Sequence, residues 1–248
     1  MLKERESYAY QLGEQAQGII SDILDGYSPP GQGVTSHEYE DEITGAILDR
    51  IRSDLAVDSD NYSITPDTYN GNTENDTGAD FAILYDVSTP EITLQTGILV
   101  QAKRYESGYY SAENKTWSKL VDQCEKMLEY ATDSYVIDYS TNEDGVYMLP
   151  AASIAGTSTS KFDDFDSDAW LPSKYHRRKP GEVLKPLFLG YIGSEYIYRA
   201  VSQATGSLAD FRRTDNLKHP DPIYTDGRGE FNEENSIRVL EFKITPKE

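Results

Sequence analysis

Apolar residues recur at helical spacing in four stretches of the chain. In residues 1–27, 35–55, 117–131 and 194–205 they return every three or four positions, the spacing of one buried face of an amphipathic helix. We therefore expect four helices, the first two separated by the proline- and glycine-rich segment SPPGQGV. The apolar positions include Leu12, Ala16, Ile19 and Ile20 in the first stretch, Ile43, Ile47, Leu48, Ile51 and Leu55 in the second, Leu120, Cys124, Met127, Leu128 and Ala131 in the third, and Ile197, Ala200, Val201 and Ala204 in the fourth.

Two strand-like runs lie between the second and third of these helices. Residues 78–87 read GADFAILYDV and residues 92–105 read ITLQTGILVQAKRY, with a short turn between them. Asp80 opens the first run, and Gln101 and Lys103 close the second on one face, because strand side chains alternate. A hairpin brings the start of one strand beside the end of the next. The pattern therefore predicts that Asp80 and Lys103 share a pocket.

The remaining pattern is consistent with one domain. A chain of 248 residues is long enough for one sizeable core. We expect an N-terminal helix and linker in residues 1–34, a core in 35–151, and a C-terminal elaboration packed on the same domain in 152–248. Further strand-like runs occur at 135–137 and 145–151, residues 151–170 read as a passage from strand to loop, and residues 237–244 look like a closing strand.

An acid beside a lysine at a strand end is the combination that a magnesium-dependent phosphodiesterase needs. The acid is a hard oxygen ligand for the metal, and the lysine places a cation near the attacked phosphate. Asp80 with Gln101-Ala102-Lys103 resembles the motif of the PD-(D/E)xK nuclease superfamily. The match is to the variant of Mrr-like restriction enzymes, in which glutamine replaces the usual acid and a basic residue, here Arg104, follows the lysine.

The resemblance covers about residues 35–151, and it implies an α/β fold with a restriction-endonuclease-like core, a central mixed β-sheet flanked by helices. It also implies a DNA endonuclease that uses Mg²⁺ or Mn²⁺. Asp80 would bind the metal directly, with Glu40 as the second acid and Glu42 as the second choice for that role. Because glutamine is uncharged, the backbone carbonyl of Ala102 would help to hold the ion. The alternative for the helical glutamates is that they only favour the positive end of their helix.

Other residues receive roles from the same resemblance. Lys103 would orient the attacking water or stabilise the charged transition state, and Gln101 would position the site through its amide. Gln123, on the helix after the Q-x-K strand, loosely resembles the Q-x-x-x-Y element of RecB-type nucleases, although the fourth position is Met127. Gln123 would then reach the active site or the DNA backbone. The alternative is an ordinary surface glutamine.

The densest basic cluster in the chain lies in residues 174–179. Such a cluster, with a tyrosine inside it, could bind phosphates and stack on a base. The alternative is an exposed loop with incidental charges. The candidate substrate-binding residues here are Lys174, Tyr175, Arg177, Arg178 and Lys179.

Net charge is the feature that fits a nuclease least well. The chain has 43 acids against 23 bases, a formal net charge of −20, which should repel DNA. One explanation is a halophilic source, where salt screens a strongly acidic surface. The other explanation is an acidic protein that mimics DNA and blocks enzymes that bind it, but such a mimic does not need Lys103 facing an acid.

Composition excludes several other classes of protein. A single cysteine excludes an internal disulfide framework and a cysteine-based zinc site, and three scattered histidines argue against a histidine-rich metal centre. No apolar run approaches the roughly 20 residues of a membrane span. The N-terminus carries charges where a signal peptide is apolar, so we expect a cytoplasmic protein with no membrane partner.

We therefore expect a metal-dependent DNA endonuclease, and the resemblance suggests a role in defence against foreign DNA or in a mobile element. Its partner would be DNA. Cutting both strands would call for a homodimer, and a helicase or another defence subunit could accompany it. Two alternatives stay open, namely a nuclease-like protein that binds nucleic acid or a partner without cutting, and an acidic DNA mimic.

Overall fold

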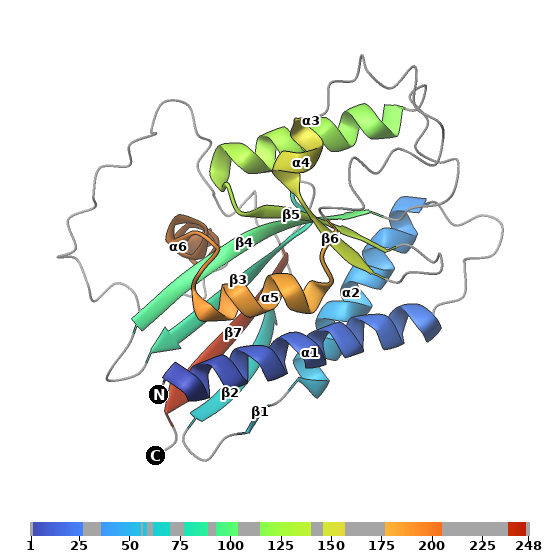
Figure 1. Cartoon of the computed structure of the whole chain (residues 1–248). Helices are drawn as coiled ribbons and strands as arrows, with labels where there is room; N and C mark the ends of the chain where they lie inside the picture. Colours follow the sequence, from blue (N-terminus) through green and yellow to red (C-terminus); the bar gives the residue numbers. More distant parts are fainter. Residues whose placement is uncertain are drawn as a thin grey trace.

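The computed structural model shows an α/β protein built on one mixed β-sheet with helices on both faces (Figure 1). No described helix is both long enough and apolar enough to span a bilayer. The structure describes residues 2–26, 36–55, 57–58, 62–69, 77–88, 93–103, 115–139, 146–156, 177–204 and 238–246. For some of these residues only the backbone is described, including residues 36–41, 57–58 and 62–69.

The described sheet has seven strands in the order β1-β2-β7-β3-β4-β5-β6. Pairing is parallel between β3 and β7 and between β4 and β5, and antiparallel elsewhere. The sheet is therefore open and mixed, as the sequence predicts. The strands are β1 (Val57–Asp58), β2 (Tyr62–Tyr69), β3 (Phe81–Ser88), β4 (Thr93–Lys103), β5 (Ser134–Asp138), β6 (Tyr147–Pro150) and β7 (Arg238–Pro246).

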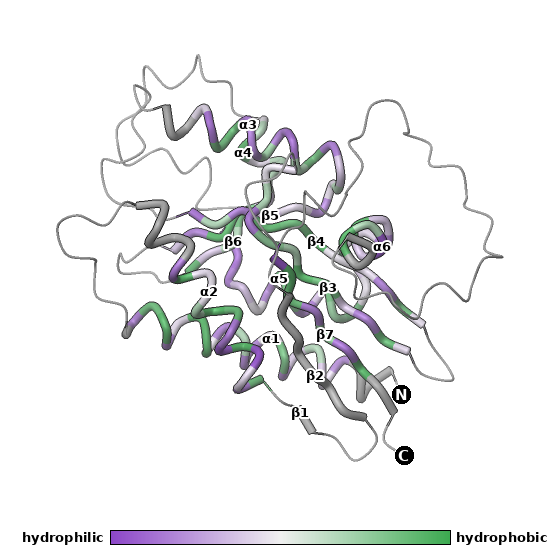
Figure 2. Tube along the Cα trace, turned by 180° about the vertical axis from the view of Figure 1, so that it is seen from behind, coloured by the Kyte–Doolittle hydropathy of each residue, from purple (hydrophilic) through white to green (hydrophobic). Residues whose placement is uncertain are grey.

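Helices cover the sheet in two layers, each with its own apolar core. Helices α1, α2 and α5 share a core with the residues of β3 at Phe81, Ile83 and Tyr85. Helices α3, α4 and α6 share the other core with the intervening residues Ala82 and Leu84. Along α3, Figure 2 shows hydrophilic and hydrophobic residues in alternation, as expected for a helix with one buried face. The helices are α1 (Leu2–Gly26), α2 (Ser36–Asp54), α3 (Lys115–Tyr130), α4 (Ala151–Ala155), α5 (Pro180–Leu189) and α6 (Glu195–Ala204).

The strand expected to close the chain lies inside the sheet. Strand β7 pairs along its length with β2 on one side and β3 on the other, so it joins the β1-β2 pair to the remaining strands. Val239, Leu240 and Phe242 are fully or almost fully buried. The part of the chain after residue 152 therefore supplies a central strand, and also helices for both layers.

Two helices were not expected from the pattern. Helix α4 begins at Ala151, where we expected the chain to pass from strand to loop, because Pro150 ends the strand and Ala151 and Ile154 bury one short helical face. Helix α5 follows the basic cluster. Pro180 occupies its first turn, the Glu182 side chain accepts the Lys179 backbone N–H at 2.8 Å, and Gly190 ends it with a left-handed φ of 72°.

Candidate functional site

The β3–β4 hairpin brings the start of one strand beside the end of the next. Phe81 pairs with Val100, and the Asp80 N–H donates to the Val100 carbonyl at 2.9 Å. Because the strands are antiparallel, Asp80 lies across from Gln101. Alternation from Ala82 places both residues on the face of the sheet that α3 covers.

The carboxylate of Asp80 is held by the end of β4. Its Oδ2 accepts the Ala102 backbone N–H at 2.7 Å and also a bond from Nε2 of Gln101. The same Gln101 nitrogen donates to the Ala102 carbonyl at 3.0 Å. Gln101 is 1% exposed, and its Oε1 has no hydrogen-bond partner. Asp80, Gln101 and Ala102 therefore form one hydrogen-bonded unit in which a buried amide oxygen remains unsatisfied.

Lys103 ends β4 on the same face as Gln101, by the alternation of the strand. Burial raises the pKa of the Cys124 thiol in α3 to about 12, and the positive charge of Lys103 opposes part of this rise. Parallel pairing places Asp138 of β5 directly beside Lys103 in the register. Asp138 is 2% exposed and was not predicted as a site residue. Its position depends on a register between distant segments, which the local sequence does not reveal.

Helix α3 forms the opposite wall of a cleft of about 520 Å³ above Asp80. The segment just before β3 approaches α3 closely at Gly78, whose φ is 74°. A Cβ at Gly78 would lie 2.4 Å from the Gln123 carbonyl oxygen. Only glycine allows this approach. Gln123 is 8% exposed, and its Oε1 also has no hydrogen-bond partner. The cleft is lined by Gly78, Ala79, Asp80, Gln101, Lys119, Asp122, Gln123, Glu125, Lys126 and Glu129. Lys103, which the sequence predicts to share a pocket with Asp80, is not among these lining residues.

Charges in this cleft are mainly negative. Four carboxylates line it together with two lysines, Lys119 and Lys126. A phosphodiester that enters the cleft therefore meets more acids than bases, and its binding would require added cations or screening salt.

Helix α2 packs on the opposite face of the sheet from α3 and contacts the same end of β4 through Tyr139. Thr44 Oγ1 and the Tyr139 hydroxyl are 3.1 Å apart and buried, and the Tyr139 N–H donates to the Lys103 carbonyl at 2.7 Å. The backbone of Glu40 lies one helical turn before Thr44, and its side chain is outside the described residues. Glu42 is exposed. The link through Tyr139 thus ties the first half of α2 to the end of β4.

Only part of the predicted basic cluster falls within the described residues. Arg104, Lys174 and Tyr175 lie outside them. Arg178 exchanges two backbone hydrogen bonds with Met148, of 2.7 and 3.0 Å, and so extends the sheet beyond β6. The Arg177 guanidinium lies over the Tyr147 ring, 5.2 Å from its centroid, and Lys179 is exposed at the start of α5. The described residues of this cluster, 177–179, lie beside β6 and at the start of α5, and none of them lines the cleft.

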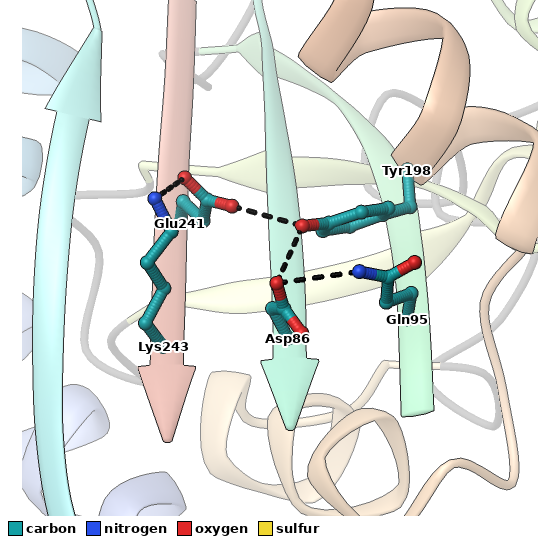
Figure 3. Close-up of polar contacts among 5 residues, drawn as sticks. All are labelled: Asp86, Gln95, Tyr198, Glu241 and Lys243. Atoms are coloured by element: carbon teal, nitrogen blue, oxygen red, sulfur yellow. Dashed lines mark hydrogen bonds and ion pairs between the residues drawn. The ribbon is translucent and has the colours of Figure 1, made fainter. Parts of the chain in front are cut away.

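A second polar cluster, which the sequence did not indicate, lies further along the sheet (Figure 3). The Tyr198 hydroxyl lies 2.7 Å from Asp86 Oδ2 and 3.2 Å from Glu241 Oε1, while Lys243 pairs with Glu241 at 3.0 Å and Gln95 donates to Asp86 at 3.4 Å. Burial, and secondly the bond to Asp86, raise the pKa of Tyr198. The cluster joins α6 to three strands. It lies six residues along β3 from the cleft, about 20 Å at the usual rise of a strand.

The oxygen atoms near Asp80 are of the type that Mg²⁺ binds. They are the Asp80 carboxylate, the unsatisfied Gln101 Oε1 and the Ala102 carbonyl, all hard donors. Within the described part of the chain, no group of three or more His, Cys, Asp or Glu side chains could hold a metal. The donor types suit an ion that keeps several water ligands, as Mg²⁺ usually does. In this arrangement Nε2 of Gln101 bonds both the Asp80 carboxylate and the Ala102 carbonyl, so an ion held by all three oxygens requires the Gln101 amide to turn over.

Comparison with known proteins adds no family to this geometry. No protein-family model matches the chain, and neither a curated protein nor a solved structure matches it.

Proposed function

We propose that this chain is a metal-dependent endonuclease that hydrolyses phosphodiester bonds in DNA. The observation that carries the proposal is the hydrogen-bonded unit of Asp80, Gln101 and Ala102 at the edge of a cleft, with Lys103 at the same strand end. A carboxylate, two amide-type oxygens and an ammonium group together provide a hard metal site beside a cation. The resemblance to PD-(D/E)xK nucleases supports the same reading.

Each residue has a separate role in the proposed site. Asp80 binds the metal, the Gln101 and Ala102 oxygens complete the protein's share of the ligands, and Glu40 provides the second acid from α2. A bound Mg²⁺ or Mn²⁺ supplies Lewis-acid chemistry and an activated water. Lys103 stabilises the negative charge that develops on the attacked phosphate.

The acidic surface sets the conditions in which such an enzyme acts. A net charge of −20 and a mainly acidic cleft both repel DNA, and the repulsion falls as ionic strength rises. We therefore infer a halophilic enzyme that cuts best in concentrated salt. Defence against foreign DNA, a homodimer that cuts both strands, and a companion helicase or other subunit remain extensions of this proposal by resemblance.

Plasmid nicking with Mg²⁺ or Mn²⁺ across a KCl series tests the activity. The native chain should cut, whereas Asp80→Asn and Lys103→Met should not, the latter because it keeps the apolar stem of lysine but not its charge. Asp49→Asn is the matched control, since Asp49 is exposed on α2 and outside the cleft. Full cleavage by the Asp80→Asn chain would refute the assigned site.

One observation favours a second candidate, a nuclease-like protein that binds nucleic acid without cutting it. Gln101 stands where the superfamily usually has an acid, and its amide nitrogen is bonded to Asp80. A site with one described carboxylate holds a metal weakly. In that case the native chain binds oligonucleotides but does not cut them, and Gln101→Glu creates or increases metal-dependent cleavage.

A further inference from the structure

The β6 edge of the sheet carries a cation stacked on an aromatic ring. The Arg177 guanidinium lies 5.2 Å from the centroid of Tyr147, and both side chains are partly exposed. The Arg177 Nε is buried and has no hydrogen-bond partner. Arg178 fixes this segment to the sheet through its two bonds with Met148. The pair is therefore anchored to the sheet by backbone pairing.

The sheet register relates this pair to the proposed active site. Lys103 pairs with Asp138, and Asp138 pairs with Tyr147, so the three residues lie in one row across β4, β5 and β6. Paired residues on neighbouring strands point to the same face of a sheet. Tyr147 therefore lies two strand spacings from Lys103, about 10 Å.

We propose that Tyr147 and Arg177 bind the nucleic-acid strand beside the cleavage position, and that this strand is unpaired there. Tyr147 stacks on a base, and Arg177 binds a backbone phosphate. Stacking on a side chain requires a base that is free of its own duplex stack, so the preferred substrate has single-stranded or splayed nucleotides next to the cut. The inference rests on the proposed function, since it takes Lys103 as the position of the attacked phosphate.

Charge determines the direction in which the strand leaves the site. Helix α3 lines the cleft with three acids and two lysines, so its net charge there is negative and disfavours phosphates in that direction. In the row of Lys103, Asp138 and Tyr147, Asp138 is 2% exposed and therefore contributes little surface charge. Arg177 lies at the end of this row, over the ring of Tyr147. The strand therefore crosses the ends of β4, β5 and β6 and does not follow α3.

The test measures binding in an Asp80→Asn background, so that cleavage does not consume the probe. Fluorescence anisotropy follows a labelled single-stranded deoxyoligonucleotide and its duplex over a KCl series. Tyr147→Leu should weaken single-strand binding about 5-fold or more at every salt concentration, since one stacked base is lost. Tyr147→Phe keeps the ring and should restore binding. Arg177→Gln should reduce the slope of log affinity against log salt by about 0.7, since one phosphate contact is lost.

Controls separate this inference from the proposed function. Arg50→Gln removes an exposed cation that pairs with Asp54 on α2, and it should leave the slope unchanged. Thermal melting of each variant shows whether it is folded. If the native chain cuts DNA but the Tyr147 and Arg177 variants bind like their parent, or if the parent prefers duplex, the inference is overturned and the proposed function stands. If the native chain neither cuts nor binds, both are overturned.

Discussion

Replacement of Asp80 separates its proposed metal-binding role from its structural role. Asparagine keeps an oxygen that can accept the bonds from the Ala102 N–H and the Gln101 amide, but it removes the charge. A hydrogen bond to a charged group contributes about 1.5–3 kcal/mol and a neutral one about 0.5–1.5 kcal/mol. The difference is about 1–1.5 kcal/mol for each bond, so for two bonds we expect Asp80→Asn to lower the free energy of unfolding by about 2–3 kcal/mol.

Alanine at the same position should cost more stability. It leaves the buried Ala102 N–H without its acceptor, while the Gln101 amide keeps the Ala102 carbonyl at 3.0 Å. One orphaned donor, at about 1–3 kcal/mol, and one lost bond to a charged group, at about 1.5–3 kcal/mol, together cost about 2.5–6 kcal/mol. At about 2–4 °C per kcal/mol for a chain of this size, the melting temperature should fall by about 4–12 °C for Asp80→Asn and by about 5–24 °C for Asp80→Ala.

The nicking rate should depend on the charge at position 80 and not on the stability of the variant. Loss of a residue that only supports a metal ligand commonly costs 10- to 100-fold, so loss of the ligand's own charge should lower the nicking rate by at least about 100-fold. The assay is plasmid nicking in excess Mg²⁺, paired with calorimetric melting of the same samples. Asp80→Asn should remain folded, cut very slowly and need more Mg²⁺ for half its activity. Near-native nicking by a folded Asp80→Asn chain would show that Asp80 does not bind the metal.

Further predictions concern neighbouring positions. Gly78→Ala should unfold more easily by at least about 1–3 kcal/mol, because the residue has a φ of 74° and its Cβ would meet the Gln123 carbonyl, and chemical denaturation would measure this. Without metal, Gln101→Glu should melt at a lower temperature than the native chain, since two carboxylates then meet. Added Mg²⁺ should raise the melting temperature of this variant more than that of the native chain, and equal responses to Mg²⁺ would contradict a metal site here. Cys124 has its pKa raised from 9.0 to about 12 by burial, so the folded state holds this proton more tightly than the unfolded state does. Its contribution to stability is therefore complete below pH 9 and is lost as pH rises through 12, and Cys124→Ala should lose less stability than the native chain over that range in urea titrations. Tyr198→Phe should cost about 1.5–3 kcal/mol near neutral pH, because Asp86 and Glu241 lose their shared donor; an unchanged urea midpoint would show that the cluster in Figure 3 contributes no stability.

Local pattern was sufficient for the hairpin and for four of the helices. In each of the two strands, alternation determines which side chains share a face. The short turn between the strands makes antiparallel pairing the simplest way to join them. The contact between Asp80 and Gln101 follows from that register. In α5, by contrast, two prolines and the nearby basic residues obscured an apolar face that packs against α1.

Pairing between distant segments could not be inferred in the same way. Glu241 in β7 carries a charge, yet Tyr198 and Lys243 cover it, and it is 1% exposed. No local signal distinguishes a central strand from an edge strand of this length. The position of Asp138 beside Lys103 likewise depends on a parallel pairing across the whole of α3.

The position of β7 also determines when the protein can fold during synthesis. Ribosomes deliver the β1-β2 pair and the β3–β4 hairpin early, yet neither can complete its hydrogen bonding until residues 238–246 emerge between them. Until then, β2 and β3 each keep one open edge, and α1 and α2 cover an incomplete core. The β1-β2 pair therefore cannot join the rest of the sheet before translation has passed the last described strand.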